Sequence, residues 1–182
     1  MHFSELINIR QSVRKYSNRQ VGKEKIKRCL EAARMAPSAS NSQPWHFVVV
    51  DEPELKEKVA RLTYSKVVSF NKFTHQAPVI VVIIIEKPKL VTQIGGVIKN
   101  KEYPLIDIGI AAGHFCLQAA EENLGTCMLG WFNENAIKKL LHIPAKKTIG
   151  LLITLGYPAD NYPIRSKIRK KPEDVVSYNR YK

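Results

Sequence analysis

One run, Pro78 to Glu86, constrains the fold more than any other part of the chain. It reads Pro-Val-Ile-Val-Val-Ile-Ile-Ile-Glu, with seven consecutive β-branched residues and no polar alternation. β-branched side chains favour strands, and a strand without a polar face must be covered on both sides. The run therefore predicts a central strand with helices packed on each face of its sheet.

The remaining elements are expected to alternate around this strand. Helical spacing of apolar residues predicts helices over residues 2–11, 23–35, 54–63, 105–124 and 133–142. Apolar runs predict strands over residues 45–51, 126–132 and 148–156. A chain of 182 residues with 45% hydrophobic residues suggests one domain over residues 1–182. An α+β or α/β sandwich is the expected architecture.

Three segments carry further predictions. The helix over residues 105–124 should be nearly enclosed, with Asp107 in its first turn favouring the positive end of the helix dipole. Residues 87–104 contain Gly95-Gly96 and scattered lysines, which indicate a mobile loop or a short irregular helix, and a loop of that size is often a lid. Residues 175–178 could form an edge strand in this sheet or in that of a partner chain.

The loop from Ala36 to Pro44 places five hydrogen-bonding side chains between two prolines and leads directly into a strand. Pro37 should end the preceding helix, and Pro44 should push Gln43 toward an extended conformation. Such a turn often displays polar groups to a ligand. From composition alone, the more typical interpretation is an ordinary connection in which Ser and Asn bond their own backbone.

Basic residues are concentrated at the two ends of the chain, whose formal net charge is +13. Eight of the 29 lysines and arginines fall within residues 10–28, and seven within residues 165–182. Arg10, Ser12 and Arg14 alternate, so an extended segment would point all three side chains the same way and suit a phosphate. The charge could alternatively bind a polyanion such as RNA or cover a solvated surface.

Several familiar motifs are absent from the sequence. It has no GxxxxGK[ST] or GxGxxG phosphate loop, no CxxC, HxxxH or HExxH metal spacing, and no arguable Ser-His-Asp triad. An odd, sparse set of three cysteines fits a reducing cytoplasm. No signal peptide or membrane-length apolar run is expected. An enzyme of this composition would depend on a bound cofactor for its reactivity.

The ordered set of motifs resembles the FMN-dependent nitroreductase family over nearly the whole chain. The motifs are Arg10-Gln-Ser-Val-Arg-Lys-Tyr, Ala33-Arg-Met-Ala-Pro-Ser-Ala-Ser-Asn-Ser-Gln-Pro-Trp, Asp107 before an Ala-rich helix, Leu124-Gly, Gly130-Trp, Leu155-Gly-Tyr-Pro and Lys167-Ile-Arg. The resemblance implies a three-layer sandwich with a mixed, mostly antiparallel sheet. It also implies an intertwined homodimer in which residues 160–182 form an arm that reaches the partner.

The resemblance also assigns roles to individual residues. Arg10, Ser12, Val13 and Arg14, with Lys167 and Arg169, match positions around the FMN phosphate and ribityl chain. Pro37, Ser38 and Asn41 match loop residues that touch the flavin from the other subunit, and Gln43 matches a polar neighbour of the flavin. Asn71 loosely matches an amide near the pyrimidine edge, and Leu129 and Gly130 match backbone beside the isoalloxazine ring, although Gly130 could simply mark a bulge.

The implied activity is hydride transfer from NADH or NADPH through FMN to a nitroaromatic, a quinone or a similar small acceptor. No metal, nucleic acid or membrane is expected among the partners. The competing hypothesis is a flavin-binding or basic nucleic-acid-binding module without turnover. Residues 87–104 lack an extended lid, which favours a small generalist reductase with an open site.

Overall fold

The computed structural model describes residues 1–181, leaving aside the side chains of Val91 and Val97. Its helices are α1 (Phe3–Ile9), α2 (Lys23–Arg34), α3 (Pro53–Arg61), α4 (Leu90–Lys99), α5 (Tyr103–Glu121), α6 (Glu134–Leu140) and α7 (Pro172–Val175). Two 3-10 turns, η1 (Ala39–Asn41) and η2 (Lys72–Gln76), lie between them. The strands are β1 (Trp45–Val50), β2 (Val79–Ile85), β3 (Gly125–Leu129) and β4 (Thr148–Gly156).

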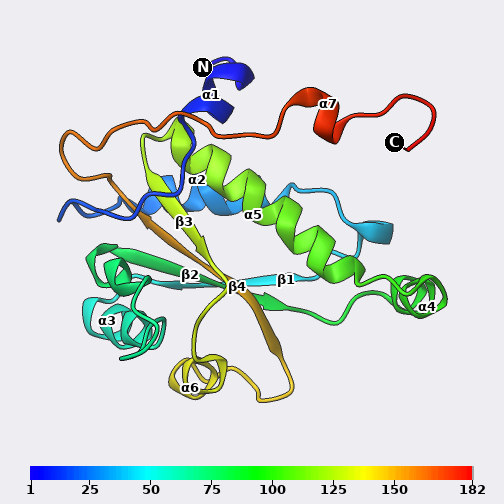
Figure 1. Cartoon of the computed structure of the whole chain (residues 1–182). Coiled ribbons are helices and arrows are strands. Elements are labelled where there is room, and N and C mark those ends of the chain that lie inside the picture. The colour runs from blue at the N-terminus through cyan, green and yellow to red at the C-terminus, as the bar shows by residue number, and fades with distance from the viewer. Residues whose placement is uncertain (182) are drawn as a thin grey trace.

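The four strands form one antiparallel sheet in the order β1-β2-β4-β3, covered by helices on both faces (Figure 1). β2 is central, as its unbroken apolar run predicts. Val79, Val81 and Ile83 pack with α2 and α5, whereas Ile80, Val82 and Ile84 pack with α3, η2 and α6. The predicted α+β three-layer sandwich is confirmed, and the described strands pair only antiparallel.

The two edges of the sheet differ. The N-terminal segment covers β3 through a parallel bridge between Ser12 and Thr126, with the Val13 N–H donating to the Thr126 carbonyl at 2.8 Å. Gly125 permits this close approach, because a Cβ there would lie 2.6 Å from the Val13 side chain. β1 pairs with β2 alone among the described residues, so its outer edge is open.

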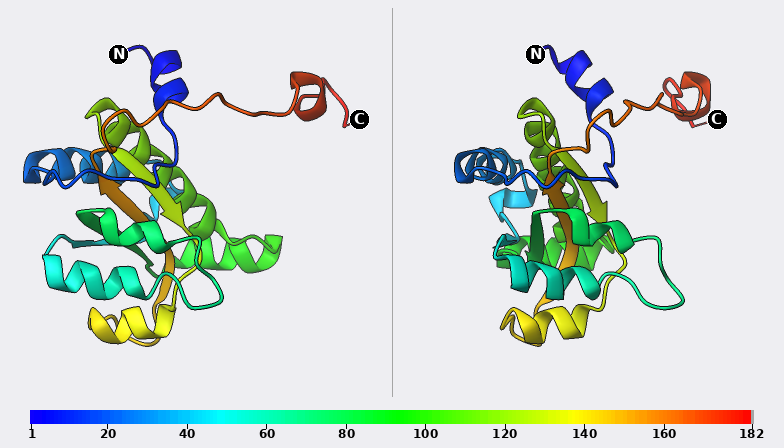
Figure 2. Two further views of the ribbon diagram at one scale, coloured as in Figure 1. Left: turned by 60° about the vertical axis from the view of Figure 1, so that its left-hand side comes forward. Right: turned by 90° about the vertical axis from the view of Figure 1, so that its left-hand side faces the viewer.

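The C-terminal arm, residues 160–181 as described, leaves β4 and extends over α5 away from the body (Figure 2). Its hydrophobic side chains are exposed, and Ile168 is 91% accessible. The prediction of an edge strand at residues 175–178 is wrong for this sheet, because Pro172–Val175 forms the short helix α7. Proline at its first position suits a helical start.

Of the two alternatives for residues 87–104, the helix is the one observed, because residues 90–99 form α4. Two other predictions need correction. The strand expected at residues 126–132 ends at Leu129 without a bulge, and the register shift of the sheet lies between Ile83 and Ile84. α5 is not nearly enclosed: Leu105, Ile106 and Gly109 are exposed, and Ile110, Gly113 and Leu117 are only partly covered.

Candidate functional site

The N-terminal segment and the start of the arm together line one hollow of about 370 Å³, here called the basic hollow. They approach from opposite ends of the sequence, as the charge distribution predicted for a shared anion. The lining consists of Arg10, Gln11, Ser12, Arg14, Arg165, Ser166, Lys167, Ile168 and Arg169.

Hydrogen bonds fasten the two segments to each other. The Lys167 ammonium donates to the carbonyl of Arg10. The Arg165 guanidinium donates to the carbonyl of Ser12 and, at 3.2 Å, to Oε1 of Gln11. Gln11 returns a bond from Nε2 to the carbonyl of Pro163 at 2.9 Å. The arm is therefore anchored at its root, while its distal part extends away.

The basic hollow has five cationic side chains and no acidic residue in its lining: Arg10, Arg14, Arg165, Lys167 and Arg169. Partial burial lowers the pKa of Lys167, and the nearby cations Arg10, Arg169 and Arg165 lower it further. Charge of one sign gathered in one concavity favours an anion, and arginine offers paired donors that match phosphate oxygens. The donor set therefore fits a phosphate group.

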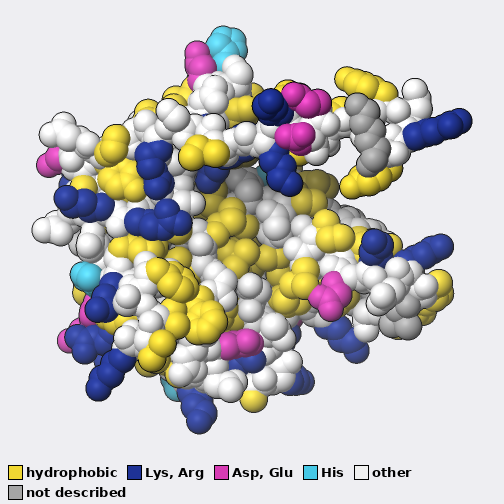
Figure 3. Space-filling view, viewed as in Figure 1, with side chains coloured by type: hydrophobic (Ala, Val, Ile, Leu, Met, Phe, Trp, Pro, Cys, Tyr) yellow, Lys and Arg dark blue, Asp and Glu magenta, His cyan; other side chains and the backbone are white. Residues whose placement is uncertain are grey.

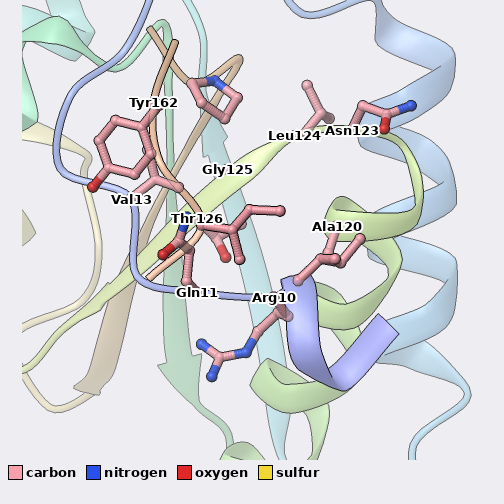
Figure 4. A pocket seen from close by; sticks show the side chains of 12 residues that line it. Arg10, Gln11, Val13, Ala120, Asn123, Leu124, Gly125, Thr126 and Tyr162 are labelled. Carbon is pink, nitrogen blue, oxygen red and sulfur yellow. The ribbon is translucent and has the colours of Figure 1, made fainter. Parts of the chain in front are cut away.

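A smaller cavity of about 170 Å³ adjoins the hollow, and Arg10 and Gln11 line both. Figure 4 shows Tyr162 on one side of it, Ala120 and Leu124 on the other, and the Arg10 guanidinium directed away from α5. This cavity lies where the N-terminal segment meets the C-terminal end of α5.

Val13, predicted to contact a cofactor, has its side chain in the core. Its N–H donates to the carbonyl of Thr126, and its own carbonyl accepts a hydrogen bond from the Tyr16 hydroxyl at 2.9 Å. Val13 thus holds the N-terminal segment in place, and its direct contact with a cofactor stays a prediction.

The end of β3 offers open backbone. A Cβ at Gly130 would meet nothing within 4 Å, which leaves room for a flat group to approach. Leu129 itself is buried. Asn71 supports this turn: its Nδ2 donates to the carbonyls of Trp131 at 3.1 Å and Thr63 at 3.2 Å. Both amide hydrogens of Asn71 are therefore directed at the main chain.

The loop predicted to face a ligand, residues 36–44, is compact and internally bonded. The Ser38 hydroxyl oxygen accepts the Gln43 N–H at 2.9 Å, and Gln43 Nε2 donates to Asn41 Oδ1 at 2.9 Å. Ser40 has a left-handed backbone with φ of 50°. Gln43 has a φ of 49°, so the extended conformation expected for it before Pro44 is wrong. Ser38 and Asn41 therefore accept hydrogen bonds from within the loop, while the Asn41 and Gln43 side chains remain exposed at the surface.

This loop and the basic hollow lie at opposite ends of α5 in one chain (Figure 1). The loop is bonded to Asp107, whereas Ala120 lies beside Arg10 in the smaller cavity. Asp107 and Ala120 are thirteen residues apart in α5, which is about 20 Å along a helix. The structure therefore does not bring the two predicted halves of the site together within one protomer.

The surface between these two halves is apolar. In Figure 3, hydrophobic side chains gather over α5 beneath the arm. Ile106 is 54% exposed there, and Gly109 and Gly113 would each accept a Cβ without contact within 4 Å. An exposed apolar face of this kind commonly marks an interaction surface.

The structure adds a residue to the site that was not predicted from the sequence. Arg165 lines the basic hollow although only Lys167 and Arg169 were predicted from the arm. The alternation of cations at 165, 167 and 169 was a usable signal, of the same kind as at 10, 12 and 14. Asp107, expected in the first turn of α5, lies beyond that turn, and its Oδ1 accepts a hydrogen bond from Ala39 of the loop instead.

Other chemistries find little support in the described side chains. Burial raises the pKa of Cys29 to about 12 and that of Cys116 to about 11, so neither thiol is an activated nucleophile. Within residues 1–181 no group of three or more His, Cys, Asp and Glu lies close enough to hold a metal ion. None of the described helices combines the length and apolar character needed to cross a membrane.

Comparison with known proteins agrees with this architecture. The sequence model described as Nitroreductase family matches residues 7–157. A protein of Archaeoglobus fulgidus, provisionally named NADH dehydrogenase/NAD(P)H nitroreductase, is 32% identical over 164 residues, 86% of this chain and 85% of that protein. Iodotyrosine deiodinase 1 of Pongo abelii is 29% identical over 203 residues, 96% of this chain and 67% of that protein.

A solved structure from Clostridium difficile R20291, described as an FMN-dependent nitroreductase, superposes with a TM-score of 0.74. It is 26% identical in sequence, and the match covers 97% of this chain and 98% of that one.

Proposed function

The chain belongs to the nitroreductase family, and from that premise we propose that it is an FMN-dependent NAD(P)H oxidoreductase. Its acceptor would be a nitroaromatic, a quinone or a similar small molecule. The observation that carries the proposal is the basic hollow, in which five cations from both ends of the chain surround a space without an acidic partner. The negative charge of the FMN phosphate would balance these five cations.

Within one protomer, different residues would contact the phosphate end and the ring end of FMN. Arg10, Ser12 and Arg14, with Lys167 and Arg169, would hold the phosphate and ribityl chain of FMN. The open backbone at Leu129 and Gly130 would lie against the ring, with Asn71 keeping that turn in place. When bound, FMN supplies the redox chemistry, taking a hydride from NAD(P)H and delivering it to the acceptor.

We place the rest of the site on a second copy of the chain. The loop with Pro37, Ser38, Asn41 and Gln43 is bonded to Asp107, which lies about 20 Å along α5 from Ala120 in the cavity beside Arg10. In the same protomer the loop is therefore too far away to complete the basic hollow. Two copies packed through the exposed face of α5 would bring the loop of one toward the hollow of the other. The arm would then reach the open edge of the partner's β1, where a strand can be added.

The free, buried cysteines suit a reducing cytoplasm, where we place the protein. A positive hollow would tolerate the extra phosphate of NADPH, so both reductants belong in the test. The deiodinase relative makes iodinated phenols a class of acceptor to include beside quinones and nitroaromatics.

Purified protein should be yellow and should bleach under anaerobic conditions when NADH or NADPH is added. Absorbance near the flavin band gives the reduction rate, and stopped-flow reoxidation with quinones, nitroaromatics and iodinated phenols ranks the acceptors. Yellow protein that never bleaches would instead indicate a flavin-binding module. Colourless protein that ignores FMN and binds RNA with a steep salt dependence would support the nucleic-acid alternative.

A further inference from the structure

Asp107 is a buried carboxylate with half of its hydrogen-bonding capacity unused. It is 3% exposed in α5, and its Oδ1 accepts the N–H of Ala39 at 3.1 Å. Its Oδ2 is the only buried side-chain nitrogen or oxygen without a hydrogen-bond partner among the described residues. A buried carboxyl oxygen without a hydrogen-bond partner is costly, so a second donor to Asp107 is expected in the working protein.

The loop that Asp107 holds has a strained backbone. Ser40, Asn41 and Gln43 all have left-handed φ values, of 50°, 51° and 49°. Residues other than glycine adopt this region at an energetic cost, and such strain persists where surrounding contacts fix it. A loop of this kind requires anchors outside itself.

Two anchors meet at one residue of the loop. The N–H of Ala39 donates to Asp107 from α5, and its carbonyl accepts from the Thr92 hydroxyl of α4 at 3.3 Å. Thr92, which is 5% exposed, also lies 2.7 Å from the Ser42 hydroxyl. Both main-chain groups of Ala39 are therefore held, each by a buried side chain from a different helix.

We propose that Asp107 is the positioning residue of the ring-facing loop, residues 36–44, and that its Oδ2, closed off in the protomer, accepts an N–H or O–H donor of the loop itself once the loop packs against a bound flavin. This inference rests on the proposed function, because it assigns the loop to a bound flavin. Thr92 fixes the other side of the same residue. The loop is then preorganised by α4 and α5 together.

The substitution Asp107→Asn separates the two roles of the carboxylate. Its amide oxygen can still accept from Ala39, while its NH2 group replaces the acceptor Oδ2. In FMN-free protein we expect a thermal midpoint equal to or above that of the wild type, because a buried, half-paired carboxyl group is replaced by a neutral amide that still accepts from Ala39. FMN binding should weaken about tenfold, which corresponds to about 1.4 kcal/mol. The midpoint potential of the bound flavin should become more positive.

Thr92→Val removes the second anchor without changing charge and should also weaken FMN binding. Thr154→Val is the matched control, because it deletes a buried hydroxyl bonded to Tyr16 at 2.7 Å, away from the loop. It should lower the thermal midpoint and leave FMN affinity and potential unchanged. Wild-type FMN affinity and potential in Asp107→Asn would overturn this inference alone. A wild-type protein that binds no FMN would overturn the proposed function as well.

Discussion

Replacing Arg14 and Arg169 together by alanine should abolish tight FMN binding. The two side chains enter the basic hollow from opposite ends of the sequence. A hydrogen bond to a charged group contributes about 1.5–3 kcal/mol, so each single change should weaken binding by roughly tenfold or more. If both cations contact one phosphate, the double change should be non-additive. Fluorescence titration of FMN-free protein with FMN measures all three dissociation constants.

Riboflavin and a charge-matched variant provide the controls. Riboflavin lacks the phosphate, so its weaker affinity should be the same in the wild type and the double variant. Replacing Lys171 and Arg180 by alanine removes the same charge from the arm outside the lining of the hollow. That variant should bind FMN as the wild type does. Simple additivity, or equal losses in both double variants, would show that no shared phosphate site exists.

Gly109→Leu should convert the protein into a stable monomer that binds FMN poorly. Gly109 is exposed in the middle of α5, and a Cβ there would contact nothing within 4 Å in the protomer. Leucine is a better helix former than glycine by about 0.5–1 kcal/mol, so the protomer itself should gain stability. In the proposed dimer the same side chain would enter a packed interface, where an overpacked contact costs about 1–3 kcal/mol per chain.

Sedimentation velocity gives the oligomeric state, and thermal unfolding gives the stability. Gly95→Leu is the matched control, since Gly95 is also helical and a Cβ there has open space, but it lies in α4. It should remain dimeric. A dimeric Gly109→Leu protein with unchanged FMN affinity would mean that this face of α5 is not the interface.

The sequence was most informative where one physical cause dominated. Seven β-branched residues in succession left β2 no exposed face, and its central position followed. The alternation of Arg10, Ser12 and Arg14 requires only an extended backbone to point three side chains one way. The basic hollow confirms that placement and joins it to the arm.

The wrong predictions for α5 and for residues 175–178 share one physical cause: burial and strand pairing depend on contacts with distant parts of the chain or with another molecule, which local sequence does not encode. Apolar spacing in α5 correctly predicted a helix, but it does not distinguish a face covered by the same chain from one left for another molecule. Val175 to Tyr178 has strand-like composition, yet in the isolated protomer Pro172 starts a short helix there. Proline fixes its own φ, and the following residues complete a single turn.

Asp107 illustrates a different limit. Its place near the start of α5 suggested a role toward the helix dipole, whereas its actual partner, Ala39, is 68 residues earlier. The left-handed backbone at Ser40 could not be predicted from the sequence either, because serine has no strong preference for that region. Long-range hydrogen bonds of this kind leave no periodic signal in the sequence.

Mixing two defective chains tests most directly whether each site is built from two subunits. One chain carries Arg14→Ala with Arg169→Ala, and the other carries Asn41→Ala with Gln43→Ala. Neither should bind FMN tightly alone. Random pairing makes half of the dimers mixed, and each mixed dimer has one intact site, so co-refolding should restore about a quarter of wild-type FMN-dependent turnover. A mixture no more active than its separate components would contradict a flavin site shared between two copies of the chain.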